Sequence, residues 1–194
     1  MKFNFSILIL SMMLFSTGSI SMLGVELFDS RESVEDLNLP VVAKEPGIIK
    51  YRTNNGNDLS LTFENDKVVY MENDWLHQPE GSKPLFSDFT FGKTSIGDIR
   101  KKFGSNGFLY SNRSFSSTDT HLVTFNCFEF DTDKNEVLVT ITGVPIAEKD
   151  QVNKNNISEK LKLLAIIIAD KKYLDKIWGE EKVFDENYKK INPN

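Results

Sequence analysis

The stretch FTFGKTSIGDIRKKFG, from Phe89 to Gly104, combines a strand end, a turn and a short helix. Its apolar side chains first alternate, as in a strand, and then recur on one helix face: Phe89 and Phe91, followed by Ile96, Ile99 and Phe103. Thr94 is placed to cap the helix start, and Gly104 is placed to end it. We therefore expect a short amphipathic helix that follows a strand.

The same helix pattern occurs twice more in the chain. VELFDSRESVEDLNLP (25–40) has a capping residue at Asp29 and a stop at Pro40, and IIIADKKYLDKIWG (166–179) has a cap at Asp170 and an end at Gly179. The repetition predicts a duplicated unit that begins with a short helix.

Runs of alternating apolar residues follow each of the first two helices, which is typical of strands. The first set is 48–53, 59–63 and 67–71, and the second is 108–115, 121–130 and 136–142. A fourth strand is expected at 85–91 in the first unit and at 161–169 in the second. Segment 161–169 also fits a buried helix, although its three consecutive isoleucines favour a strand covered on both faces.

These elements predict an α+β fold built as a tandem repeat. Each unit would pair a short helix with an antiparallel sheet of about four strands, with the helices on one sheet face. The expected boundaries are a signal peptide at 1–21, units at 22–91 and 92–179, and a polar tail at 180–194 that frays.

The first residues, MKFNFSILILSMMLFSTGSIS, have the order of a secretory signal peptide: one Lys, an apolar run and small residues. We expect cleavage between Ser21 and Met22, with cleavage after Gly18 as the alternative. The apolar run is too short to span a bilayer, and no longer one follows, so no transmembrane anchor is expected in the mature chain. The predicted location is the periplasm of a bacterium or the medium.

Composition argues against several classes of protein. The 194 residues carry 23 basic and 28 acidic side chains, which disfavours nucleic-acid binding. Cys127 is the only cysteine, and its alternation with Val123 and Phe125 predicts a buried strand position. His77 and His121 are far apart in the sequence, which disfavours a zinc site. We expect no metal, no cofactor and no catalytic residue.

The segment 89–104, followed by strands and an F-x-x-D-K hairpin, resembles the BamE/SmpA family of small exported envelope domains. Two such units in tandem are similar to the β-lactamase inhibitor protein. The family's lipoprotein cysteine is absent, and Ser105 stands where a proline often follows the helix-ending glycine. The resemblance implies a non-enzymatic, protein-binding exported domain.

The leading hypothesis is an exported module that binds another exported or envelope protein through an aromatic-rich sheet face. Aromatic side chains bury a large area at low entropic cost. The candidate contacts are Tyr51, Tyr70, Trp75, Tyr110 and Phe115. The alternative is an immunity or inhibitor protein against a periplasm-acting enzyme. A less favoured third class is a carboxylate-dependent hydrolase, for which Glu129 and Asp131 offer a pair on one strand.

Overall fold

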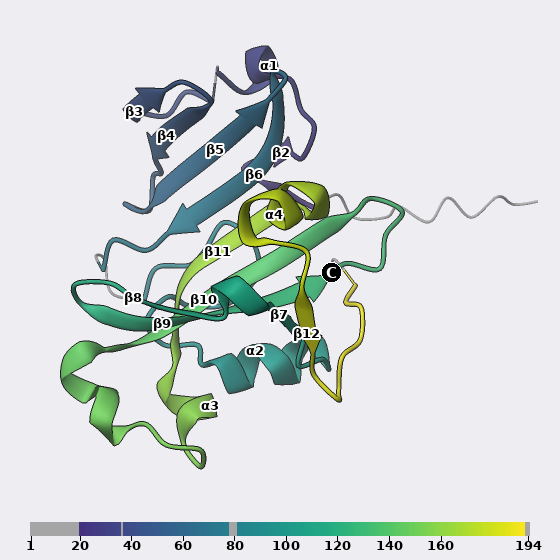
Figure 1. Ribbon diagram of the computed structural model, residues 1–194. Coiled ribbons are helices and arrows are strands. Elements are labelled where there is room, and N and C mark those ends of the chain that lie inside the picture. Colours follow the sequence, from purple (N-terminus) through teal and green to yellow (C-terminus); the bar gives the residue numbers. More distant parts are fainter. Residues whose placement is uncertain (1–19, 36, 78–80, 193–194) are drawn as a thin grey trace, which may run out of the picture.

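The computed structural model describes residues 20–35, 37–77 and 81–192, and it contains one large antiparallel sheet of ten strands (Figure 1). The strand order is β12-β7-β9-β10-β11-β6-β5-β4-β3, and β8 also pairs with β9. The strands are β3 (Val41–Glu45), β4 (Ile48–Arg52), β5 (Asp58–Glu64), β6 (Lys67–Asp74), β7 (Phe108–Tyr110), β8 (Phe115–Ser117), β9 (His121–Glu129), β10 (Glu136–Pro145), β11 (Lys162–Asp170) and β12 (Lys182–Phe184).

The helices are few and short. They are α1 (Arg31–Glu35), α2 (Ile96–Phe103), α3 (Ile157–Lys160) and α4 (Lys171–Trp178), with 3₁₀ turns η1 (Ser111–Arg113) and η2 (Ile146–Gln151). A small separate sheet joins β1 (Ser21–Met22) to β2 (Val25–Glu26). The protein is therefore mostly β.

The predicted fold class, a tandem of helix plus four-stranded sheet, is wrong. β6 and β11 pair along their length, from Tyr70 opposite Ala169 to Asp74 opposite Ala165. This pairing joins the strands of the two expected sheets into one. It satisfies backbone groups that would otherwise lie on two exposed edges, which is a strong reason for the sheets to merge.

The prediction that all helices lie on one sheet face is also wrong. Val34 of α1 and Ile99 of α2 pack in a core that includes Leu61, Met71 and Ile166, and we name this side the first face. Leu174 of α4 packs on the opposite side, which we name the second face.

The second face has its own core beneath α4. Val137, Val139 and Ile167 lie in this core, with neighbouring residues of the same strands on the first face. Central strands that are apolar at consecutive positions need cover on both faces, and α4 supplies it.

The segment 161–169 is a strand, because β11 runs from Lys162 to Asp170 with both faces buried. The strand expected at 85–91 is wrong, since this segment forms turns that pack Phe89 and Phe91 into the first-face core. The strand expected at 108–115 is interrupted by η1, which gives two short strands.

The residue that caps the start of α2 is Ser95, one residue after the expected cap Thr94. The Ser95 Oγ accepts the backbone N–H of Asp98, and the Asp98 carboxylate accepts the N–H of Ser95, which is a capping box. Thr94 instead accepts the N–H of Thr90. Gly104 ends the helix at φ 59°, as expected of a glycine at this position.

The expectation that the tail frays is wrong for residues 180–192. β12 pairs with β7, and Phe184 stacks on Phe108 with ring centroids 5.2 Å apart. The Tyr188 hydroxyl donates to the Glu129 carboxylate at 2.6 Å, and Ile191 is buried. These contacts hold the charged segment against the sheet.

The predicted cleavage site falls on β1. Residues 1–19 lie outside the described part of the chain, but Ile20 and Met22 are both buried in the first-face core. Cleavage between Ser21 and Met22 would remove Ile20 from this core, whereas cleavage after Gly18 would keep it. The signal peptide itself stays a prediction.

Candidate functional site

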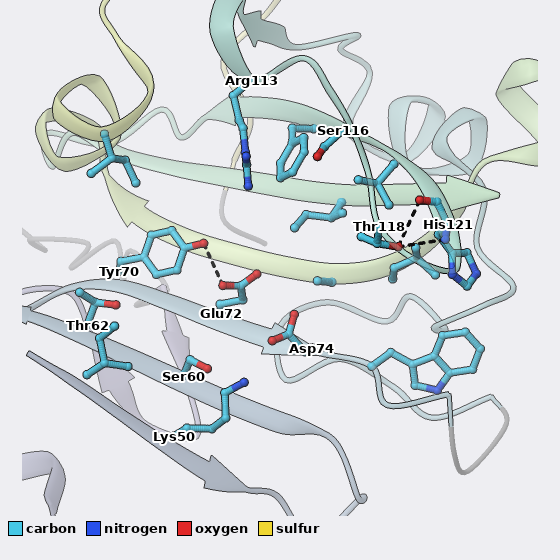
Figure 2. A pocket seen from close by; sticks show the side chains of 18 of the residues that line it. Lys50, Ser60, Thr62, Tyr70, Glu72, Asp74, Arg113, Ser116, Thr118 and His121 are labelled. Atoms are coloured by element: carbon cyan, nitrogen blue, oxygen red, sulfur yellow. Dashed lines mark hydrogen bonds between the residues drawn. The ribbon is translucent and has the colours of Figure 1, made fainter. Parts of the chain in front are cut away.

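A groove of about 850 Å³ lies on the second face, beside α4 (Figure 2). Its floor consists of polar side chains from three adjacent strands: Lys50 on β4, Ser60 and Thr62 on β5, and Glu72 and Asp74 on β6. Their neighbours Ile49, Leu61 and Met71 face the first-face core instead. Alternation along β4, β5 and β6 thus leaves one polar face that no helix covers.

The walls of the groove come from the other half of the molecule. Tyr173, Ile177 and Trp178 of α4 line one part, and Ser116, Thr118 and His121 of the β8–β9 hairpin line another. Figure 2 shows the floor strands and the hairpin facing each other across the opening. The groove therefore needs both halves of the sheet to be in place.

Three polar side chains on β6 form a row on the floor. The Tyr70 hydroxyl donates to Glu72 Oε2 at 2.9 Å, and Asp74 follows Glu72 on the same strand and lines the same groove. Burial, followed by the charge of Asp74, raises the pKa of Glu72 to about 7. Burial also raises the pKa of Asp74, against the opposing effect of Lys50. Glu72 thus exchanges its proton near neutral pH.

The nearest floor cation is already engaged elsewhere. Lys50 Nζ lies 3.8 Å from Asp58 Oδ2, and Arg52 Nε lies 2.6 Å from the other Asp58 oxygen. Within residues 20–35, 37–77 and 81–192, Glu72 and Asp74 have no Lys, Arg or His nitrogen within 4.0 Å. Lys50 acts on the two carboxyl groups from a greater distance and lowers the pKa of each, so neither is held in a direct ion pair.

Arg113 enters the groove from the opposite wall (Figure 2). Its guanidinium lies over the ring of Phe125, 4.5 Å from the centroid, and 5.9 Å from that of Trp178. Cation–π contact holds the charge on this wall, away from the acidic row. The groove therefore presents negative charge on the floor and positive charge above it.

Two histidines meet at one end of the groove. The rings of His77 and His121 stack with centroids 5.1 Å apart, and Trp75 packs on His77 at 4.6 Å. Burial and the charge of His77 lower the pKa of His121. The sequence gives no sign of this stack, because His77 and His121 lie far apart along the chain.

The described residues contain no group of three or more His, Cys, Asp and Glu side chains arranged to hold a metal. The His77–His121 stack is therefore an aromatic end wall, and nothing in its geometry adds a third ligand.

The five aromatic residues expected to bind a partner occupy different environments. Tyr70 and Trp75 line the groove. Tyr51 and Tyr110 are each only 1% exposed, in the first-face and second-face cores respectively, so their assignment to a binding surface is wrong. Their hydroxyls donate to the Val34 carbonyl and to Asp175, which explains how tyrosines are accommodated in cores. Phe115 is 59% exposed on β8 and does not line the groove.

Two further residues singled out from the sequence also have clear positions. Cys127 is a buried free thiol, as expected, and burial raises its pKa far above the usual range, which suppresses the reactive thiolate. Glu129 accepts from Tyr188, while Asp131 is exposed in the β9–β10 connection. The carboxylate pair that lies in a groove is Glu72 and Asp74, which the sequence analysis missed although KVVYMEND places both on one strand face.

None of the helices in the described part of the chain is long and apolar enough to span a membrane.

The sequence matches no protein-family model and no curated protein. Among solved structures it is similar to a cysteine-rich secretory protein from Staphylococcus aureus, with 12% identity and a TM-score of 0.38. The similarity covers 84% of this chain and 50% of that protein, so this chain corresponds to about half of that protein's length. A similarity at this level carries no argument about fold or function.

Proposed function

We propose that the protein is an exported, non-enzymatic module that binds an extended segment of another exported or envelope protein in the groove. The supporting observation is the open, polar half of the second face, which meets the aromatic side chains of α4 at one wall. A volume of about 850 Å³ lies in the size range of ligand sites. Export rests on the predicted signal peptide, and a protein partner is what the BamE/SmpA resemblance implies.

The shape of the groove favours a polypeptide segment as its occupant. Ile48 and Ile177 are 39% and 44% exposed on its rims, where they offer apolar contacts to side chains of a bound strand. Ser60, Thr62 and Thr118 supply hydroxyls between those rims. A bound segment could therefore place apolar side chains on the two isoleucines and polar groups on the hydroxyls.

The proposal is tested by capture from envelope extract with the processed protein as bait. Thr62→Trp fills the floor of the groove, while Lys101→Trp places the same side chain on the exposed surface of α2. We expect Thr62→Trp to lose the partner captured by wild type and Lys101→Trp to keep it. Equal capture by the two variants would overturn the groove as the binding site. A captured enzyme that is inhibited by the protein would identify the partner class of the inhibitor alternative.

One observation favours a second candidate, carboxylate-dependent hydrolysis. Glu72 with a pKa of about 7 beside Asp74 has the form of a general acid next to a base. Turnover of casein or peptidoglycan by wild type, lost in Glu72→Gln, would establish this candidate. Turnover that is absent, or unchanged in Glu72→Gln, would remove it.

A further inference from the structure

We propose that the groove floor recognises a single cationic side chain, a Lys or Arg of the bound segment, through the Glu72–Asp74 carboxylates. This inference rests on the proposed function and specifies the chemistry of its ligand. It depends on the position of the carboxylates inside the cavity, on the absence of a cation within 4.0 Å of them among the described residues, and on the charges that surround them.

The first argument is charge complementarity at the floor. Glu72 and Asp74 project from one face of β6 into the cavity (Figure 2), and the Asp58 carboxylate beside them is occupied by Lys50 and Arg52. Placing two carboxylates in a partly desolvated groove is costly unless an opposite charge arrives. A ligand ammonium or guanidinium would supply that charge and could donate hydrogen bonds to both carboxylates.

The charges around the two carboxylates limit how many positive charges the ligand can carry. The charged and titratable groups facing the site from each packed element are Glu45 on β3, Lys50 on β4, Asp58 on β5, Tyr70 on β6, Tyr173 on α4, Arg113 on η1, His77, and His121 on β9. Lys50 on the floor and Arg113 on the opposite wall carry positive charge into the same groove, so a run of basic residues would meet repulsion. A lone cation between neutral residues fits the arrangement best.

The Tyr70 hydroxyl makes the site more selective. It donates to Glu72 Oε2 and so fixes one carboxylate oxygen, which leaves the other oxygen and Asp74 to meet the ligand. A neutral amide, such as the side chain of Gln, offers weaker hydrogen bonds and no charge to offset the burial of the carboxylates. The floor should therefore discriminate Lys from Gln.

Binding of a cation at this site is coupled to the loss of a proton from Glu72. The proton that Glu72 carries must leave when the ligand cation arrives, because the cation favours the ionised form. With the pKa of Glu72 at about 7, most of the site is protonated at pH 6 and most is ionised at pH 8. Binding of a cationic segment should strengthen as the pH rises through 7.

The test uses two probe peptides of equal length, acetyl-Ala-Ala-Lys-Ala-Ala-amide and the same peptide with Gln at the centre. Each is titrated into the isotope-labelled processed protein, and the shifts of assigned groove resonances give both the location and the affinity. We expect the Lys probe to shift groove resonances, with affinity about tenfold tighter at pH 8 than at pH 6. The Gln probe should bind more weakly and without that pH dependence.

Variants separate the carboxylate site from general electrostatics. Glu72→Gln should reduce affinity for the Lys probe at pH 8 to that of the Gln probe and remove the pH dependence. The matched control is Glu159→Gln on the exposed α3, which removes the same charge outside the groove and should leave affinity unchanged.

Each contrary outcome overturns the inference. Equal groove shifts from both probes would show that the floor does not select a cation, while leaving segment binding intact. Shifts confined to other surfaces, or none in the groove, would remove the cation site. The capture experiment with Thr62→Trp tests the proposed function separately, so the two failures are distinguishable.

Discussion

The second face of the sheet has two halves that differ in composition and in cover. Under α4, Val137, Val139 and Ile167 are fully buried, whereas the β4–β6 half presents Lys50, Thr62 and similar polar side chains to the groove. Both halves carry an apolar core on the first face.

The difference follows from the length of α4. Eight residues of helix extend about 12 Å, while strands lie about 4.8 Å apart, so α4 cannot cover a sheet of ten strands. The strands beyond its reach alternate apolar with polar residues, and this uncovered half forms the groove floor. The groove thus exists because α4 covers only part of the second face.

The largest loss of stability is expected from a substitution in the half of the second face that α4 covers. Leu174 of α4 is fully buried against the sheet, so Leu174→Ala should lower the free energy of unfolding by about 3 kcal/mol through lost burial and a residual cavity. Ile177 lies on the same helix but is 44% exposed, and Ile177→Ala should cost less than about 1 kcal/mol. Urea denaturation compares the two variants. Equal losses would show that α4 is not packed as described.

A smaller effect of opposite sign is expected in the open half. The pKa of Glu72 is raised from 4.5 to about 7 in the folded protein, so protonation stabilises the fold. This contribution is present below pH 4.5 and is lost as the pH rises through 7. Glu72→Gln should therefore raise the free energy of unfolding by roughly 2 kcal/mol at pH 8, allowing for partial solvent exposure, and by little at pH 4.

Thermal unfolding across this pH range, with Glu159→Gln as the control, measures the effect. A Glu72→Gln variant that is less stable than wild type at pH 8 would contradict the assigned proton. A buried carboxylate that lowers the stability of the fold is typical of a functional site.

Part of the difference between the two halves could be predicted from the sequence. The alternation in 48–53, 59–63 and 67–71 predicted strands with one apolar face, and the three isoleucines of 161–169 favoured a strand covered on both faces. The buried position of Cys127 was also predicted from its neighbours and is confirmed. Periodicity reports which side of an element is apolar, and these elements were predicted for that reason.

Other features depend on partners that periodicity cannot specify. Nothing in KVVYMEND or LKLLAIIIA says that β6 and β11 pair, so one sheet was mistaken for two. The residues next to Tyr51 and Tyr110 are the same whether other parts of the chain or solvent cover these tyrosines, so their burial could not be read from the sequence. The groove carboxylates became recognisable only once α4 and the β8–β9 hairpin were placed opposite β6.

The first face, on which residues of α1 and α2 pack, offers a test with a smaller expected effect. Ser95→Ala removes the side-chain acceptor of the α2 capping box and should cost about 1 kcal/mol. Ser158→Ala on the neighbouring α3 removes an exposed hydroxyl and should be near neutral. Chemical denaturation of both variants gives the comparison, and an unchanged Ser95→Ala would argue against the observed cap.

The smallest effect is expected at the centre of the groove floor. Thr62 is half-buried on β5 and lines the groove, so Thr62→Ala should change the free energy of unfolding by less than about 0.5 kcal/mol. Urea denaturation beside Leu174→Ala would show that the open half contributes little to stability. A loss comparable with that of Leu174→Ala would mean that the two halves do not differ as described.

The proposal that a partner binds at the uncovered half of the second face is tested most directly by photocrosslinking in envelope extract. A benzophenone amino acid is placed at Thr62, or at Lys101 on the exposed surface of α2. We expect a partner adduct from position 62 and none from position 101. An adduct from position 101 alone would contradict it.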